Sequence, residues 1–271
     1  MSAELERLEA RLAQEDGLIV AYSGGADSAL LAVVAHRVLG PRALAATAVS
    51  ASLPSAERRD AKRFAREQGM AHVEVCTNEL DNPDYVANDG DRCSHCKSAM
   101  FDELAPLARI MGARIALGTN VDDLGDHRPG QAAAAERGAV FPMVDVGLTK
   151  GHVRELSREL GLRTASKPSA ACLASRVAYG DRVTPEILGR IERAEESLRE
   201  VGLTGFRVRS HGDGSVARIE VQEQDLGRVI DHRIELGRRV VEAGFLFVSL
   251  DLAGFRSGNM NRLLSLTPVT R

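Results

Sequence analysis

The feature that most constrains the fold is a glycine-rich turn between two apolar segments. Residues 18–22 (LIVAY) form an apolar run of strand length, residues 23–28 (SGGADS) follow, and residues 29–39 form an apolar segment of helical length. A strand, a tight loop and a helix in this order place backbone N–H groups and the positive end of the helix dipole around one point. Because glycine lets the backbone approach a ligand closely, we predict that Gly24 and Gly25 belong to a phosphate-binding loop.

The polar side chains of this loop suit a nucleotide and its magnesium ion. The hydroxyls of Ser23 and Ser28 can donate hydrogen bonds to phosphate oxygens, and Asp27 can hold Mg²⁺ or a Mg²⁺-bound water. The Walker pattern Gly-x-x-x-x-Gly-Lys-Ser/Thr does not occur here, so no lysine of the loop supports the β and γ phosphates. Transfer of the γ-phosphoryl group is therefore disfavoured. An ordinary Ser-Gly-Gly turn is the alternative.

The same alternation of strand-like and helix-like segments continues along the chain and predicts a parallel α/β domain. A second group of polar residues, Gly118 to Asp123, follows a short strand that we expect at residues 115–117. The carboxyl ends of parallel strands form the ligand crevice, so Gly118 is assigned to the far side of the nucleotide pocket, with a plain turn as the alternative. The other predicted elements are strands at 43–49, 72–76 and 140–146 and helices at 55–68, 95–111 and 150–160.

The chain is expected to contain a nucleotide domain, a functional loop and a small α+β domain. Residues 1–165 form the first, residues 166–183 the loop, which is rich in Ser, Ala, Pro and Gly, and residues 184–271 the last. Helices at 185–201 and 224–243, a hairpin around 211–214 and a strand at 245–250 are predicted in the small domain.

Three of the four cysteines are candidates for chemistry. Cys172 stands in the polar loop, where it could act as a nucleophile with Lys167 and Arg176 lowering its pKa; a small buried hydrophobe is the alternative. Cys93 and Cys96 form a C-x-x-C pair without a second such pair. Together with Cys172 they fit an iron-sulfur cluster with one open iron better than a closed zinc site. Cys76, at the end of a predicted strand, looks structural.

Charge and hydropathy restrict location and partners. Lys plus Arg against Asp plus Glu gives 35 − 38 = −3, which does not favour a nucleic-acid partner. Residues 1–16 show helical amphipathic spacing rather than a signal peptide, and no apolar run approaches the roughly 20 residues of a membrane span. We expect a cytoplasmic protein without a membrane partner, whose exposed helices in the small domain could support a homo-oligomer.

Residues 23–28 resemble the Ser-Gly-Gly-x-Asp-Ser signature of the PP-loop ATP pyrophosphatases. Several further stretches resemble one branch, the LarE-type ATP-dependent sulfur transferases of nickel-pincer cofactor biosynthesis. The matching segments are 92–97 (RCSHCK), 118–126 (GTNVDDLGD), 128–130 (RPG), 171–176 (ACLASR) and 179–180 (YG).

The resemblance implies that the loop grips the pyrophosphate end of ATP and that a carboxylate of pyridinium-3,5-biscarboxylic acid mononucleotide is adenylated, with release of pyrophosphate. Sulfur then replaces the activated oxygen to give a thiocarboxylate. In single-cysteine members the residue matching Cys172 gives up its sulfur and becomes dehydroalanine. Members with three cysteines, as with Cys93, Cys96 and Cys172 here, are thought to bind a four-iron four-sulfur cluster. The substrate carries a phosphate, and Arg207 and Arg209, on one face of a predicted strand, would suit it.

Two other functions compete with this interpretation. A PP-loop tRNA 2-thiolation enzyme also combines C-x-x-C with a third cysteine, but the net charge of −3 and the lack of an evident RNA-binding domain argue against it. A non-catalytic ATP-binding protein would not require Cys172 and would release no pyrophosphate.

Overall fold

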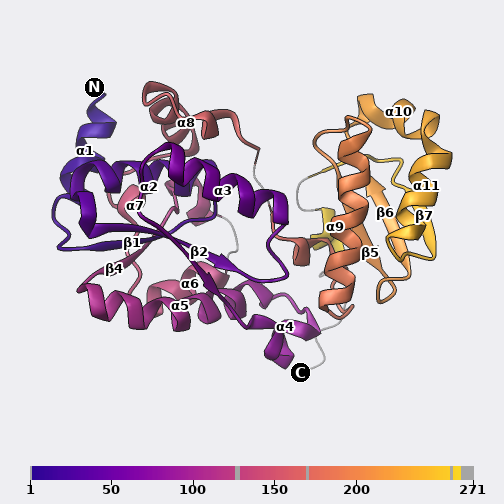
Figure 1. Cartoon of the computed structure of the whole chain (residues 1–271), viewed down its shortest axis with the longest axis horizontal. Helices are drawn as coiled ribbons and strands as arrows, with labels where there is room; N and C mark the ends of the chain where they lie inside the picture. The colour runs from indigo at the N-terminus through magenta and orange to yellow at the C-terminus, as the bar shows by residue number, and fades with distance from the viewer. Residues whose placement is uncertain (1, 126–128, 169–170, 257–258, 264–271) are drawn as a thin grey trace. The chain divides into compact units, whose positions relative to one another are not determined.

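Short apolar runs in the N-terminal half form one parallel sheet in the computed structural model, which describes residues 2–125, 129–168, 171–256 and 259–263. The strand order is β3-β2-β1-β4 (Figure 1), and Leu18 of β1 lies opposite Ala43 of β2 on one side and Arg114 of β4 on the other. The predicted parallel α/β architecture is thereby confirmed. The strands are β1 (Leu18–Ala21), β2 (Ala43–Val49), β3 (His72–Cys76) and β4 (Arg114–Leu117).

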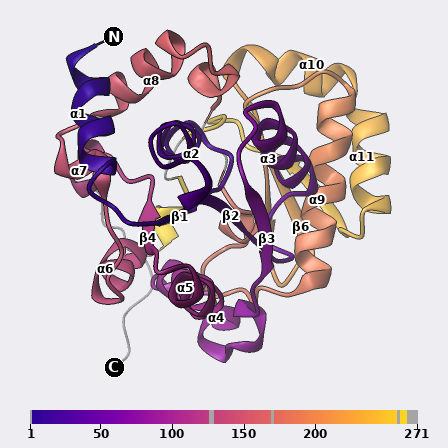
Figure 2. The same cartoon turned by 60° about the vertical axis from the view of Figure 1, so that its left-hand side comes forward.

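Helices cover both faces of this sheet (Figure 2), because successive strand residues point to opposite sides. Leu18 and Val20 enter one core and Ile19 enters the other. The first core is shared with α1 (Ala3–Leu12), α2 (Ala26–Leu39), α3 (Ser55–Glu67), α7 (Pro142–Asp145) and α8 (Lys150–Glu159). The second is shared with α5 (Arg92–Met111) and α6 (Pro129–Glu136).

The prediction of a strand at residues 140–146 is wrong. Val140 makes a single parallel bridge to Ala116, and the chain then enters the short helix α7 at Pro142. Proline removes a backbone donor from a strand but is well suited to the first turn of a helix. The apolar side chains of this segment are still buried, with Met143 fully inside the first core.

A smaller mixed sheet forms the C-terminal part and has the order β5-β6-β7. The predicted hairpin is confirmed by the antiparallel pairing of β5 with β6, and β7 runs parallel to β6. The helix predicted at 224–243 is instead two helices with a break at His232, whose φ of −94° and ψ of 11° are not helical. The elements are α9 (Pro185–Glu200), β5 (Arg207–His211), β6 (Val216–Glu220), α10 (Leu226–Asp231), α11 (Arg233–Glu242) and β7 (Phe247–Leu250).

The chain divides into two compact units, residues 1–79 with 93–170 and residues 80–92 with 171–271. This division differs from the predicted domain boundaries, because residues 80–92, which include α4 (Pro83–Ala87), belong to the second unit. Asn88 accounts for this placement: its side chain is fully buried and donates hydrogen bonds to the carbonyls of Ala178 at 2.7 Å and Asp181 at 3.0 Å.

Candidate functional site

The predicted phosphate loop joins β1 to α2 in the first unit. The Ser23 and Ser28 hydroxyls lie 3.1 Å apart, and the backbone N–H of Ser23 donates to Ser28 Oγ at 3.2 Å. The N–H of Gly25 points toward Ser23 Oγ at 3.4 Å. Two hydroxyls and the backbone N–H groups at the start of a helix are thus collected in one place, which suits an anion.

Gly24 cannot carry a side chain in this conformation. Its φ of +75° lies in the left-handed region, and a Cβ atom would come within 2.8 Å of Ala61 Cβ on α3. Just before the loop, the buried Tyr22 hydroxyl donates to the Ala61 carbonyl at 3.2 Å. The loop is therefore packed directly against α3.

Gly118, at the carboxyl end of β4, also lies against the loop. A Cβ atom there would be 2.8 Å from both the Cα and the N of Ser28 and 3.0 Å from the carbonyl carbon of Asp27. The structure thus brings Gly118 together with the first turn of α2, and only glycine permits this approach.

Asp27 belongs to a hydrogen-bonded chain that extends from the loop to α8. Asn120 Nδ2 donates to Asp27 Oδ1 at 2.9 Å, and the backbone N–H of Asn120 donates to Asp123 Oδ2 at 3.2 Å. Lys150 Nζ lies 3.1 Å from Asp123 Oδ1. Burial raises the pKa of Asp27 above its ordinary value, and the hydrogen bond from Asn120 opposes that rise.

Cys93 and Cys96 lie in the first turns of α5, three residues apart and so on one face of the helix. Gly130 approaches this turn closely: a Cβ atom at Gly130 would be 2.9 Å from the Cys93 carbonyl oxygen and from Lys97 Cγ. Two segments that carried the family resemblance, 92–97 and 128–130, are thus in contact through Gly130, although Arg128 and Asp126 lie outside the described residues.

Cys172 is exposed and precedes a 3₁₀ turn at Leu173–Arg176 in the second unit. Its carbonyl accepts hydrogen bonds from Ser175 Oγ at 2.7 Å and from Arg176 Nη1 at 3.1 Å. Arg176 itself is buried and pairs with the buried Glu195 at 3.0 Å. The segment is therefore fixed by its backbone while the thiol faces solvent. Cys76 lies at the end of β3, as expected, opposite Val49, and its side chain is exposed.

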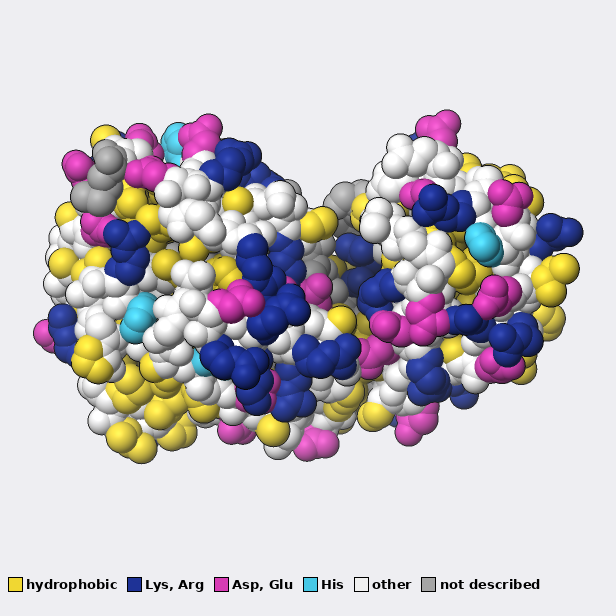
Figure 3. Space-filling view, turned by 45° about the horizontal axis from the view of Figure 1, so that its top comes forward, with side chains coloured by type: hydrophobic (Ala, Val, Ile, Leu, Met, Phe, Trp, Pro, Cys, Tyr) yellow, Lys and Arg dark blue, Asp and Glu magenta, His cyan; other side chains and the backbone are white. Residues whose placement is uncertain are grey.

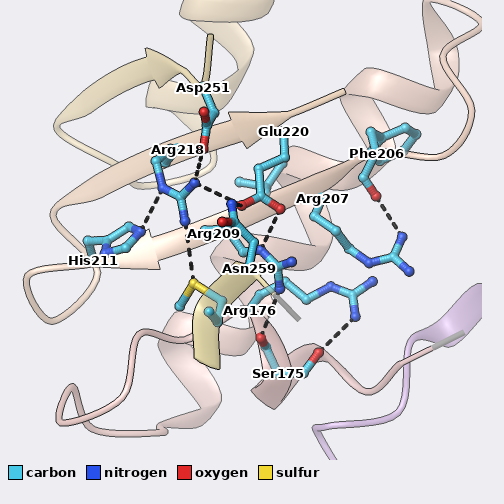
Figure 4. Close-up of polar contacts among 12 residues, drawn as sticks. Ser175, Arg176, Phe206, Arg207, Arg209, His211, Arg218, Glu220, Asp251 and Asn259 are labelled. Atoms are coloured by element: carbon cyan, nitrogen blue, oxygen red, sulfur yellow. Dashed lines mark hydrogen bonds and ion pairs between the residues drawn. The ribbon is translucent and has the colours of Figure 1, made fainter. Parts of the chain in front are cut away.

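The two predicted phosphate-binding arginines lie beside this segment (Figure 4). Arg209 Nη1 donates to the Ser175 carbonyl at 3.0 Å, and Arg209 Nε donates to Glu220 Oε2 at 2.9 Å. Burial lowers the pKa of Arg207 to about 10, and the positive charge of Arg176 adds to the effect. Arg176, Arg207 and Arg209 therefore form a cationic cluster next to the Cys172 segment.

The three candidate metal-binding cysteines do not lie in one unit, since Cys93 and Cys96 belong to the first and Cys172 to the second. Among the residues that the structure describes, no three His, Cys, Asp or Glu side chains are grouped to hold a metal ion. The paired cysteines on one helix face fit two ligands of a cluster, and the three-cysteine set remains a prediction.

Two residues with contacts in the phosphate loop were not among the predicted site residues. Asn120 was noted only as part of a polar strand end, and its burial beside Asp27 is the signal that identifies it. Lys167 was considered only as a neighbour of Cys172, but its ammonium contacts Gly24 in the first unit. This contact spans 143 residues of sequence and has no local pattern.

A parallel sheet with a Ser-Gly-Gly-x-Asp-Ser loop between its first strand and helix defines the PP-loop class of ATP-using enzymes. No protein-family model matches the chain. Individual relatives do: the chain is 33% identical to the pyridinium-3,5-bisthiocarboxylic acid mononucleotide synthase of Lactiplantibacillus plantarum over 95% of this chain and 94% of that protein. The chain belongs to this family, the LarE-type sulfur transferases.

Two other relatives also match the chain. An uncharacterized protein of Synechocystis sp. is 44% identical and covers 98% of this chain and 99% of its own length. The tRNA-specific 2-thiouridylase MnmA of Gluconobacter oxydans is 26% identical over 68% of this chain and 63% of its own length. None of the helices within the described residues is long and apolar enough to cross a membrane.

Proposed function

We propose that this enzyme adenylates a carboxylate of pyridinium-3,5-biscarboxylic acid mononucleotide and converts it to a thiocarboxylate for nickel-pincer cofactor biosynthesis. The observation that carries the proposal is the exposed Cys172 next to an arginine cluster of which Arg176 and Arg209 are buried, in a relative of a synthase of the bisthiocarboxylic product. A non-catalytic ATP-binding protein would need neither the thiol nor the arginines.

Adenylation is assigned to the phosphate loop. The hydroxyls of Ser23 and Ser28 and the N–H groups of Gly24 and Gly25 bind the β and γ phosphates of ATP, and Gly118 leaves room for the loop to close on them. A substrate carboxylate oxygen attacks the α-phosphorus, the bond to the bridging oxygen breaks, and pyrophosphate leaves. Charge stabilisation of the leaving group is the main catalytic contribution of such a loop.

A magnesium ion fits the residues beside the loop. Asp27 provides a carboxylate, and the fully buried Asn120 has an Oδ1 atom without a hydrogen-bond partner among the described residues. Mg²⁺ prefers oxygen ligands and takes one or two from protein and the rest from phosphates and water. Asp27 would hold the ion, which neutralises developing phosphate charge, while Asn120 fixes the orientation of the Asp27 carboxylate.

The cationic cluster is assigned to the phosphate of the mononucleotide. The low pKa of Arg207 reflects burial and like charges nearby, and an anion between Arg207 and Arg209 would relieve that repulsion. Arg209 already contacts the carbonyl of Ser175, so a phosphate bound here lies beside the segment that carries Cys172.

Cys172 supplies or helps to supply the sulfur. As a sacrificial donor, its thiolate attacks the activated carbonyl carbon and AMP leaves; loss of the Cα proton then breaks the Cβ–S bond, leaving the thiocarboxylate and dehydroalanine. Alternatively, Cys93, Cys96 and Cys172 would be three ligands of a four-iron four-sulfur cluster, which would supply sulfide-level sulfur to the activated carbonyl and spare the Cys172 side chain.

The charge distribution favours a small substrate over RNA. Figure 3 shows Lys and Arg side chains gathered on one face of the first unit, with Asp and Glu among them. On α3, Arg58 and Lys62 both pair with Glu74, and Arg63 pairs with Asp60. Cations paired in this way release fewer counterions on binding a phosphate backbone than unpaired ones do.

The test compares wild type with Cys172→Ala, using Cys76→Ala as a matched exposed-cysteine control. We expect Cys172→Ala to release pyrophosphate but to make no thiocarboxylate, because the thiol acts after adenylation. The control should do both. ADP and orthophosphate without AMP would refute adenylation, and sulfur-containing product at the normal rate from Cys172→Ala would refute the role of Cys172.

The iron content of the purified protein and its mass after reaction distinguish the two sulfur sources. Protein purified without oxygen that contains iron, and loses it in Cys93→Ala or Cys96→Ala, supports the cluster. A loss of about 34 Da at Cys172 after one turnover, the mass of H₂S, supports sacrifice. If the enzyme thiolates bulk tRNA and does not react with the mononucleotide, the result instead supports the tRNA 2-thiolation enzyme.

A further inference from the structure

Lys167 makes a contact with the phosphate loop that the proposed function does not use. Its ammonium donates a hydrogen bond to the backbone carbonyl of Gly24 at 3.0 Å. The side chain is only 15% exposed, so this is a largely desolvated charge next to the loop backbone. The loop has no Walker lysine of its own, and this lysine comes from far along the chain, within the same unit.

Two carboxylates on α3 hold Lys167 in place. Lys167 Nζ lies 2.7 Å from Glu57 Oε2 and 2.9 Å from Asp60 Oδ2, and these two acids are three residues apart on one helix face. Burial alone would raise the pKa of Asp60, but hydrogen bonds from Lys167 and Arg163 outweigh burial and hold that pKa below its ordinary value. Asp60 is therefore ionised and anchors the ammonium.

The contact determines which way one peptide group of the loop faces. The peptide between Gly24 and Gly25 is planar and trans, so its carbonyl and its N–H point in opposite directions. With the carbonyl directed at Lys167, the N–H of Gly25 points toward Ser23 Oγ, the side on which both loop hydroxyls lie. A charged partner on the carbonyl also strengthens that N–H as a donor.

A flip of this peptide would remove one phosphate donor and place a carbonyl oxygen among the anion-binding groups. Such a flip rotates ψ of Gly24 and φ of Gly25, and it is accessible because Gly25, whose φ is −76°, can as a glycine also take a positive φ. The two glycines thus leave the loop flexible at this peptide, and the contact of Lys167 with the Gly24 carbonyl restrains it.

We propose that Lys167 is a positioning residue of the adenylation site, which binds the Gly24 carbonyl so that the Gly25 N–H faces the pyrophosphate of ATP. The inference rests on the proposed function in that it takes the loop as the pyrophosphate site. It assigns Lys167 no contact with substrate.

The test is calorimetric titration of wild type and Lys167→Met with MgATP, pyrophosphate and AMP. We expect Lys167→Met to bind MgATP and pyrophosphate about ten- to a hundredfold more weakly, the range for one charge-assisted hydrogen bond, with AMP affinity unchanged. Lys167→Arg should recover part of the affinity because it keeps a charged donor. Arg163→Gln is the matched control: it removes another cation from Asp60 but not the Gly24 contact, and should keep wild-type affinity.

The inference is overturned if Lys167→Met binds MgATP with the affinity of the wild type. It is also overturned if the affinities for MgATP and AMP fall equally, because that would indicate a general structural role. A different result would refute the proposed function. If the wild-type enzyme binds MgATP but releases no pyrophosphate when the mononucleotide is added, the proposed adenylation does not occur. In that case, a loss of MgATP affinity in Lys167→Met would still support the positioning role.

Discussion

Replacing Gly118 with alanine tests whether the close approach of β4 to the phosphate loop matters for ATP chemistry. The new Cβ would lie 2.8 Å from two backbone atoms of Ser28, whereas ordinary contacts begin near 3.4 Å, so one of the two segments must move by about 3.4 − 2.8 = 0.6 Å. The atoms in the way belong to the first turn of α2 and cannot rotate aside as a side chain could. Overpacking of this kind costs about 1–3 kcal/mol.

The displacement falls on the residues proposed to bind the nucleotide. Misplacement of reacting groups by about 1 Å can reduce a rate about a hundredfold, so a shift of this size should reduce pyrophosphate release about ten- to a hundredfold. The melting temperature should fall by roughly 2–12 °C, from about 2–4 °C per kcal/mol for a domain of this size. Both are measured on one preparation, by a coupled pyrophosphate assay and by thermal melting followed by circular dichroism.

The matched control is Gly151→Ala in α8, where the new Cβ would be 3.5 Å from Thr149 Oγ1, an ordinary contact. Alanine is the better helix former, so this variant should be at least as stable as wild type and fully active. Unchanged melting temperature and activity in Gly118→Ala would refute the steric argument. A destabilised variant with the wild-type rate would show that the approach supports folding but not catalysis.

Two further predictions concern buried charges. Asp27→Asn should abolish pyrophosphate release yet raise the melting temperature at pH 7. Burial raises the pKa of Asp27, so the folded state disfavours the ionised carboxylate that asparagine removes. The gain in melting temperature should therefore shrink as the pH falls through the raised pKa. A variant less stable than wild type at pH 7 would contradict this sign. Arg176→Met should destabilise the second unit by about 3–5 kcal/mol in urea denaturation, because it leaves Glu195 buried without its nearest partner. Arg176→Met combined with Glu195→Leu should recover most of that loss, and equal instability of the single and double variants would contradict the ion-pair explanation.

The parallel sheet was predictable because each strand has a local signal. Strands β2 and β3 match their predicted limits, and helices α8 and α9 begin where predicted, each after a threonine cap, Thr149 and Thr184. In both caps the threonine hydroxyl accepts a backbone hydrogen bond at 3.3 Å. Local chemistry determined these features, so one sequence was sufficient.

The predictions were wrong where the sequence pattern fits more than one secondary structure. Residues 140–146 are buried as predicted, but burial alone does not distinguish a strand from a short helix, and Pro142 favours the helix. The break at His232 within 224–243 lacks any proline, and the structure gives no physical account of it beyond the non-helical backbone angles.

The residues proposed for the site could be chosen from the sequence, but their supporting contacts could not. The loop residues were chosen from their order along the chain, since the proposed donors to phosphate are local. The partners that hold them are not: Asn120 reaches Asp27 across 93 residues, and Arg209 bonds the Ser175 carbonyl across 34. Which acid neutralises which arginine depends on strand register, which the sequence pattern leaves undetermined.

The proposed adenylation and sulfur transfer should be separable, because the residues assigned to them are anchored in different units. The segment that joins them begins at Lys167, tied to Gly24 in the first unit, and reaches Cys172, whose carbonyl is held by Arg176 in the second. Removing the Cys172 thiol leaves every described contact of the phosphate loop intact, which is why pyrophosphate release should survive that change. Removing the Lys167 ammonium should instead weaken nucleotide binding, and it leaves the hydrogen bonds around Cys172 in place.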